Sequence, residues 1–161
     1  MLEKLREFIN ELPILSDEVD AEMESMEYDA TNSEQLRTVR EQAQHNVCAH
    51  LKQEGQCYKV IYFINAMTVC GACDEKLDGA YVEINNPVSD KGMYINHLLL
   101  HTFIHHDQLY VNEPNVDVSG NMDGTRRIDL NLVNLLKVLD RAAVPADIEK
   151  EVTGYFAAKS G

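Results

Sequence analysis

Basic residues, cysteines and long apolar runs are all scarce in this sequence, and each shortage excludes a class of protein. The 161 residues include only four cysteines, too few for a scaffold held together by disulfides. No run approaches the roughly 18 apolar residues that a membrane span requires, and residues 1–6 lack the apolar core of a signal peptide. We therefore expect a cytoplasmic protein with reduced thiols and no membrane association.

The shortage of basic residues leaves a strong negative charge. Lys and Arg together number 14, against 27 for Asp and Glu, which gives a formal net charge of −13. Such a charge repels nucleic-acid phosphates and anionic membranes, whereas it attracts and steers a basic protein partner. Direct binding to nucleic acid is accordingly not expected.

In other respects the composition is that of an ordinary folded chain. With 45% hydrophobic and 25% charged residues, the sequence lies far from the composition of disordered proteins. Its length suits one hydrophobic core. Residues 1–161 are therefore predicted to form a single globular domain.

The spacing of apolar residues predicts an α+β fold with N-terminal helices, a small mixed or antiparallel central sheet and two C-terminal helices. The sheet is indicated by β-branched and aromatic runs at 58–64 and 80–84. Helices are expected where apolar residues recur every three or four positions between capping residues and breakers. These helices are residues 2–12, 16–26, 32–55, 128–139 and 145–158, and a further short strand is expected at 116–118.

Residues 93–111 fit two secondary structures equally well. The run is apolar enough for a buried helix, but it also fits a hairpin whose loop is residues 105–108. Periodicity does not separate a buried helix from a buried strand in a segment of this kind.

The pair Cys70 and Cys73 is the sharpest local motif. Two cysteines three positions apart on a tight turn can present both thiolates to one tetrahedral ion, or can act as a redox pair. A zinc ion needs two more ligands. Cys48 and Cys57 would complete an all-cysteine set, and the group His45, Cys48 and His50 offers other completions.

The stretch from Val60 to Cys73 resembles the strand and CxxC motif of thioredoxin-like proteins. That resemblance implies a thiol oxidoreductase with Cys70 as the nucleophile, Cys73 as the resolving thiol and Pro114 as the cis-proline of the family. Val69 stands where the family has tryptophan, and Asp78-Gly79 interrupts the helix that follows the motif in the family.

Histidines form a second group of candidate ligands. His97, His101 and His105 are four positions apart, so either a helix or a strand aligns them on one face, and His106 follows directly. Neighbouring imidazoles on one face can chelate a metal ion. The alternative is a polar face beside a core made by Leu98, Leu99 and Phe103.

The densest charge lies between residues 17 and 29, where seven acids occur without a base. Together with the net charge, this segment predicts a small acidic, non-enzymatic interaction protein (an inhibitor, adaptor or accessory subunit) that binds a basic protein surface, with mimicry of nucleic-acid phosphates as one form. A zinc-binding protein and a thiol oxidoreductase, both using Cys70 and Cys73, remain the alternatives. The partner-binding residues of the first hypothesis are Asp17, Glu18, Asp20, Glu22, Glu24, Glu27 and Asp29.

Overall fold

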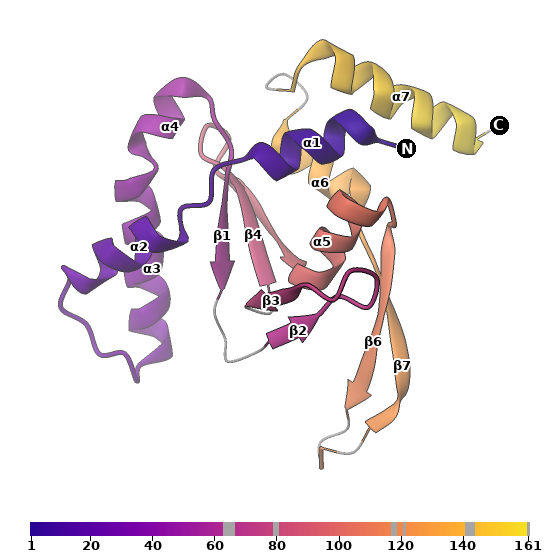
Figure 1. Cartoon of the computed structure of the whole chain (residues 1–161). Helices are drawn as coiled ribbons and strands as arrows, with labels where there is room; N and C mark the ends of the chain where they lie inside the picture. Colours follow the sequence, from indigo (N-terminus) through magenta and orange to yellow (C-terminus); the bar gives the residue numbers. More distant parts are fainter. Residues whose placement is uncertain (63–66, 79–80, 117–118, 121, 141–143, 161) are drawn as a thin grey trace.

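The computed structural model has an α+β architecture in which helices pack on both sides of a small antiparallel sheet (Figure 1). It describes residues 1–62, 67–78, 81–116, 119–120, 122–140 and 144–160. The helices are α1 (Glu3–Glu11), α2 (Ser16–Glu24), α3 (Ser33–Val47), α4 (Ala49–Glu54), α5 (His97–His106), α6 (Leu132–Leu139) and α7 (Ala146–Ser160). The strands are β1 (Tyr58–Tyr62), β2 (Met67–Val69), β3 (Lys76–Asp78), β4 (Tyr81–Asn86), β5 (Lys91–Asn96), β6 (Tyr110–Val116) and β7 (Met122–Asp129).

The central sheet has the order β1-β4-β5, and all of its pairings are antiparallel. Cross-strand neighbours share a face, so Ile61, Val82 and Ile95 lie side by side and face the main core. The opposite face carries Tyr58 and Val60, which pack against α2, α3 and α4 in a second cluster. The sheet thus separates two hydrophobic clusters.

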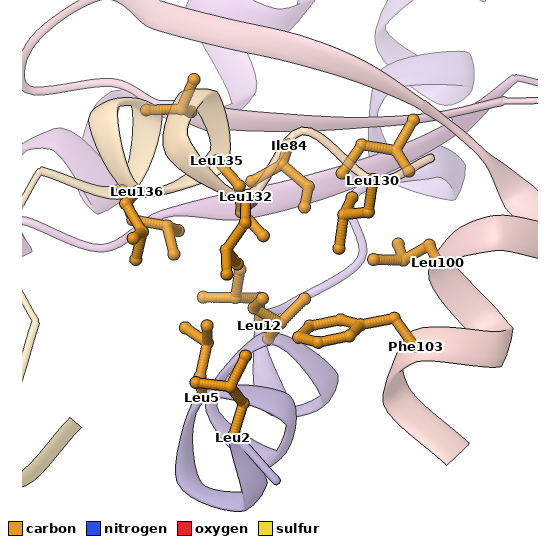
Figure 2. Close-up of a cluster of buried hydrophobic side chains, with 14 of the residues drawn as sticks. Leu2, Leu5, Leu12, Ile84, Leu100, Phe103, Leu130, Leu132, Leu135 and Leu136 are labelled. Atoms are coloured by element: carbon orange, nitrogen blue, oxygen red, sulfur yellow. The ribbon is translucent and has the colours of Figure 1, made fainter. Parts of the chain in front are cut away.

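The main core lies between the sheet and the helices α1, α5, α6 and α7. Figure 2 shows Leu5 and Leu12 from the α1 region, Phe103 from α5, Leu135 from α6 and Ile84 of β4 in one cluster. Phe103 and Leu135 are completely buried. Each helix contributes its apolar stripe, which is the arrangement expected for amphipathic helices covering one face of a sheet.

Helix termini follow local signals in the sequence. Asn32 caps α3, because its side-chain oxygen accepts hydrogen bonds from the backbone N–H groups of Glu34 and Gln35, both at 3.1 Å. The expected helix at 32–55 breaks at Cys48 into α3 and α4, and Gly55 ends it with a φ of 68°. Ser16 does not cap α2, because its hydroxyl accepts a hydrogen bond from the N–H of Ile61 at 2.8 Å.

Residues 93–111 contain a helix between two strands. Asn96 caps α5 by accepting a hydrogen bond from the N–H of Leu99 at 3.1 Å, and Asp107 ends the helix in the left-handed conformation. Residues 105–108 therefore do not form a hairpin loop. The helix expected at 128–139 begins only at Leu132, because Ile128 lies in β7, paired with Val111 of β6. Residues 117–118 of the short strand expected at 116–118 fall outside the described residues.

The first and last helices lie side by side (Figure 1). The side chain of Glu151 on α7 accepts hydrogen bonds from the N–H groups of Lys4 and Leu5 on α1, each at 3.0 Å. A carboxylate from α7 thereby satisfies donors that the first turn of α1 leaves unpaired. None of the helices among the described residues combines the length and the apolarity that crossing a membrane would take.

Candidate metal centre

The Cys70–Cys73 motif lies on the turn that joins β2 to β3. These two strands form a hairpin of their own, with Val69 paired to Lys76, and do not join the central sheet. The N–H of Cys70 donates to the carbonyl of Glu75 at 2.9 Å, and the N–H of Asp74 donates to the carbonyl of Cys70 at 2.8 Å. These two bonds close the tight turn that carries both cysteines.

Two histidines near this cysteine turn come from α5, which lies beside the hairpin in Figure 1. One face of α5 places Leu99, Leu100 and Phe103 in the main core, while His101 and His106 reach the cysteine turn. Arg6 of α1 holds the end of α5, since its Nε donates to the carbonyls of Phe103 at 2.8 Å and Ile104 at 3.1 Å. The histidines therefore project from a helix that is anchored along its length.

Four potential ligand atoms meet between these two elements: the sulfurs of Cys70 and Cys73 and one ring nitrogen each of His101 and His106. All of them lie within 4.8 Å of one another. The Sγ of Cys73 is 3.3 Å from Nε2 of His101, and the Sγ of Cys70 is 3.5 Å from Nε2 of His106.

These separations suit a tetrahedral zinc ion. With Zn–S bonds of about 2.3 Å and Zn–N bonds of about 2.0–2.1 Å, a tetrahedron sets its sulfur and nitrogen ligands about 3.6 Å apart. A hydrogen bond between a thiol and an imidazole produces similar distances. What distinguishes the cluster is that two such pairs lie together, with all four potential ligand atoms within 4.8 Å of one another.

A carboxylate stands behind one of the histidines. Nδ1 of His101 lies 3.4 Å from Oε2 of Glu75, while Nε2 of the same ring faces Cys73. Metal-binding histidines commonly donate their second ring N–H to a carboxylate, which orients the ring and makes the ligating nitrogen more basic. Glu75 belongs to the cysteine turn. The hairpin therefore supplies the two cysteine ligands and also the carboxylate that orients His101.

The protonation of His101 favours a ligand role. Burial lowers the pKa of His101 below its ordinary value of 6.5, and His105 lowers it further, while the Glu75 carboxylate opposes the shift. His101 is therefore neutral at pH 7, which is the form that binds metal ions. For Cys73 the backbone N–H of Glu75 lowers the pKa, but partial desolvation and the adjacent Cys70 thiol together outweigh it and leave the pKa raised.

The cluster is closed on one side and open on the other. Cys70 and His101 are buried, His106 is half-buried and Cys73 is exposed. An ion bound here would be shielded by the body of the protein on the side of Cys70 and would meet solvent on the side of Cys73.

The structure brings together three of the residues that the sequence marks as candidate ligands, Cys70, Cys73 and His101, and adds His106. His105 is exposed, with its ring centroid 4.8 Å from that of His101, and His97 lies four residues before His101 on α5. Neither belongs to the four-residue cluster.

The two remaining cysteines lie in the hydrophobic clusters. Cys57 belongs to the main core, where burial and, to a smaller extent, Asp140 raise its pKa to about 11. Cys48 belongs to the second cluster, where its thiol donates to the carbonyl of His45 at 3.8 Å. Both residues lie among apolar side chains, outside the four-residue cluster, and act as small buried hydrophobes.

The environment of Cys70 differs from that of a thioredoxin-like nucleophile. Cys73 is followed by β3, so the motif lies on a hairpin turn and not at the start of a helix whose N-terminal dipole would lower a thiol pKa. No cis peptide bond occurs among the residues that the structure describes, and Pro114 lies within β6.

The acidic residues predicted to bind a partner lie on α2 and in the segment that follows it. Asp17, Glu18, Asp20, Glu22 and Glu24 belong to α2, and Glu27 and Asp29 precede α3. Six are exposed, and the half-buried Glu22 accepts a hydrogen bond from Asn46 at 3.0 Å. Asp29 accepts hydrogen bonds from the hydroxyl and the N–H of Thr31, which lower the pKa of Asp29. Binding of these residues to a basic partner stays a prediction.

Comparison of the chain with protein-family models, with curated proteins and with solved structures finds no match. The fold and the cluster therefore define the protein only by class, as an α+β protein with a candidate Cys2His2 metal centre.

Proposed function

We propose that the protein binds one zinc ion through Cys70, Cys73, His101 and His106, and that this ion fastens the β2–β3 hairpin to α5. The proposal rests on one observation, the convergence of four ligand atoms within 4.8 Å from two separate elements. Only the folded chain brings these atoms together, because at least 28 positions separate each cysteine from its nearest histidine partner.

The donor atoms favour zinc over other common ions. Two thiolates and two imidazoles in a tetrahedral arrangement are a typical zinc set, whereas calcium and magnesium take oxygen ligands. Glu75 fits the same choice. It is not one of the four ligands, and its carboxylate contacts Nδ1 of His101, so it can orient that imidazole toward a zinc ion.

A structural role follows from the ligand count and from the weak attachment of the hairpin. Four protein ligands fill a tetrahedral zinc ion and leave no position for a substrate. The hairpin is a separate two-stranded sheet, and its buried residues Cys70 and Leu77 belong to neither hydrophobic cluster of the described residues. A two-stranded hairpin is marginally stable without further support, which a shared ion would provide.

Elemental analysis of the purified chain tests the proposal, with two adjacent histidines as a matched pair. We expect one zinc per chain in the wild type. His106→Ala removes a ligand and is expected to weaken zinc binding more than 100-fold in competition with a chromogenic chelator, beyond the roughly 10- to 100-fold cost of losing a group outside the coordination sphere. His105→Ala, one position away, is expected to keep stoichiometric zinc.

A second pair separates ligation from general thiol effects. Cys70→Ala should abolish stoichiometric zinc, whereas Cys48→Ala should retain it, because Cys48 lies in the second cluster. A wild-type chain that holds no zinc after purification in its presence would overturn the proposal. So would equal losses in the two histidine variants.

A further inference from the structure

The two cysteines of the proposed centre differ sharply in their access to solvent. Cys70 is 2% exposed, whereas Cys73 is exposed. A small oxidant arriving from solvent therefore meets one sulfur first. The second sulfur is held close behind it, because both ligand atoms belong to a group that spans no more than 4.8 Å.

We propose, building on the zinc centre proposed above, that hydroperoxides regulate it: oxidation of Cys73 leads to a Cys70–Cys73 disulfide, expels the zinc ion and frees the β2–β3 hairpin from α5. Cys73 is the site of attack because it is exposed, and Cys70 resolves the oxidised sulfur because it is the nearest thiol.

The chemistry balances in two steps. The Cys73 thiolate attacks the outer oxygen of the hydroperoxide, the O–O bond breaks, and the alkoxide or hydroxide that leaves takes a proton, which leaves a sulfenic acid on Cys73. The Cys70 thiolate then attacks that sulfur, the S–O bond breaks, and the hydroxide leaves as water after taking a second proton. Two thiolates lose two electrons, the hydroperoxide gains them, and Zn²⁺ leaves without change of oxidation state.

The turn has room to close the disulfide. The bond needs the sulfurs at about 2.05 Å, which means that the two ends of the motif must move together. Gly71 and Ala72 between them are exposed, and a Cβ added at Gly71 would meet no atom within 4 Å. Neighbouring side chains therefore do not block a rearrangement of the turn.

No other thiol in the described part of the chain is placed to compete. Cys48 and Cys57 are buried in the two hydrophobic clusters, outside the ligand group. Cys48 and Cys57 are only 6% and 3% exposed, so an oxidant in solvent reaches Cys73 first. Oxidation should therefore yield one defined disulfide.

When both sulfurs are lost as ligands, the hairpin no longer has any atom bound to the ion. His101 and His106 stay on α5, which the main core anchors, but two imidazoles alone bind zinc far more weakly than four ligands. The hairpin is then left with its own ladder of three residue pairs.

The test treats the zinc-loaded chain with hydrogen peroxide while a chromogenic zinc indicator reports release. Mass spectrometry, after alkylation of the remaining thiols, locates the disulfide. We expect one zinc released for each Cys70–Cys73 disulfide, with Cys48 and Cys57 recovered in alkylated form, and recovery of binding after a dithiol reductant and zinc are added. The Cys73→His variant keeps four ligands but has a single sulfur in the site, and we expect it to release zinc at least tenfold more slowly.

The outcomes separate the two proposals. If the untreated wild type holds no zinc, the zinc centre itself fails. If it holds zinc but peroxide releases none, or releases it with sulfinic acid in place of the disulfide, only the regulatory proposal is overturned. Disulfide mapping in the wild type decides this even if Cys73→His fails to load, because a pairing that involves Cys48 or Cys57 contradicts the assigned route.

Discussion

Glu75 is the residue whose role in the centre can be isolated most cleanly, because it contacts His101 without being a ligand. Glu75→Gln keeps the size of the side chain but removes the charge that makes the His101 nitrogen basic. We expect zinc affinity to fall about 10- to 100-fold, the usual cost of losing such a group. Competition titration against a chelator of known affinity measures this change.

Asp74 provides the matched control for that variant. It is exposed, adjacent to Glu75 and already in the left-handed conformation that asparagine tolerates. Asp74→Asn therefore removes the same charge one position away, and zinc affinity should stay within about twofold of the wild type. Equal losses in both variants would mean that only the local negative charge matters, and not the contact with His101.

His101 also makes the metal-free protein sensitive to pH. Burial and His105, assisted by His106 and His97, hold its pKa below 6.5, and Glu75 only partly opposes them. The unfolded chain then binds more protons than the folded one, so the free energy of unfolding is highest above pH 6.5 and falls as the pH drops through the folded-state value. Urea unfolding of chelator-treated protein between about pH 5 and 8 measures this slope.

His101→Gln should flatten that dependence, because the residue that titrates differently in the two states is gone. His45→Gln is the control, since His45 is exposed on α3, away from the cluster. A slope that survives unchanged in His101→Gln would assign the pH sensitivity to other groups.

The choice of His106 over His105 illustrates what the sequence reveals about single residues. A stripe of residues four apart predicts His97, His101 and His105, and His106 lies about 140° around the helix from His101. The cysteine turn nevertheless contacts both His101 and His106, and this contact depends on tertiary packing. The sequence did contain a signal for His106. A pair of cysteines needs two more ligands to bind zinc, and two adjacent histidines, His105 and His106, end the helix.

Among whole elements, α5 has a double task, because it carries two ligands and one of the largest core side chains. Phe103 is completely buried in the main core (Figure 2). Phe103→Ala should lower the free energy of unfolding by about 3–5 kcal/mol, from lost burial and the cavity left behind. Guanidinium unfolding at fixed free zinc measures the loss.

Val133→Ala on α6 is the comparison for that variant, since its side chain is 53% exposed. Its effect should stay within about 0.5 kcal/mol. A loss below about 1 kcal/mol for Phe103→Ala would mean that α5 is not anchored as the packing indicates.

The β2–β3 hairpin should respond to metal removal more than the rest of the fold. The amide of Cys70 is bonded to the carbonyl of Glu75, and the proposed ion is what holds this turn against α5. Chelation is expected to speed amide hydrogen exchange in a peptide covering residues 67–78 and to leave one covering 81–96 nearly unchanged. Equal acceleration of both peptides would show that the ion supports the whole fold, and no acceleration would remove its structural role.

How well each element was predicted depends on whether its signal is local. The helices α1 and α7, the strands β1 and β4 and the start of the helix near residue 32 follow from periodicity and capping residues, and the structure confirms them. The ambiguity at 93–111 was resolved by Asn96 and Asp107, which define both ends of α5 within an apolar run. Ile128 was misplaced because β7 continues directly into the apolar spacing of α6, and the pairing with Val111 decides its structure.

For the molecule as a whole, the net charge of −13 predicts attraction to basic proteins. The prediction that the acidic residues of α2 bind a basic surface can be tested with a lysine-rich peptide as the probe. The variant replaces the exposed residues Asp17, Glu18 and Asp20 with lysine. We expect weaker binding and a smaller salt dependence by isothermal titration calorimetry than for the wild type.

A second triple variant with the same change in net charge tests whether location matters. Glu7, Glu41 and Glu54 are exposed and lie outside the acidic segment. Their reversal to lysine should weaken binding less than reversal on α2. If both triples weaken it equally, total charge and not the segment governs the attraction.

Glu151 lies 147 positions after Lys4 and 146 positions after Leu5 in the sequence, yet its carboxylate accepts hydrogen bonds from both of their N–H groups. During synthesis α1 is made before α7, so the carboxylate that completes its first turn is added only after the chain between them has been made. Until then the nascent chain exposes Leu2, Leu5 and Ile9, which are buried in the finished protein. A chaperone that binds short apolar segments would find its target there, and release would coincide with the docking of α7.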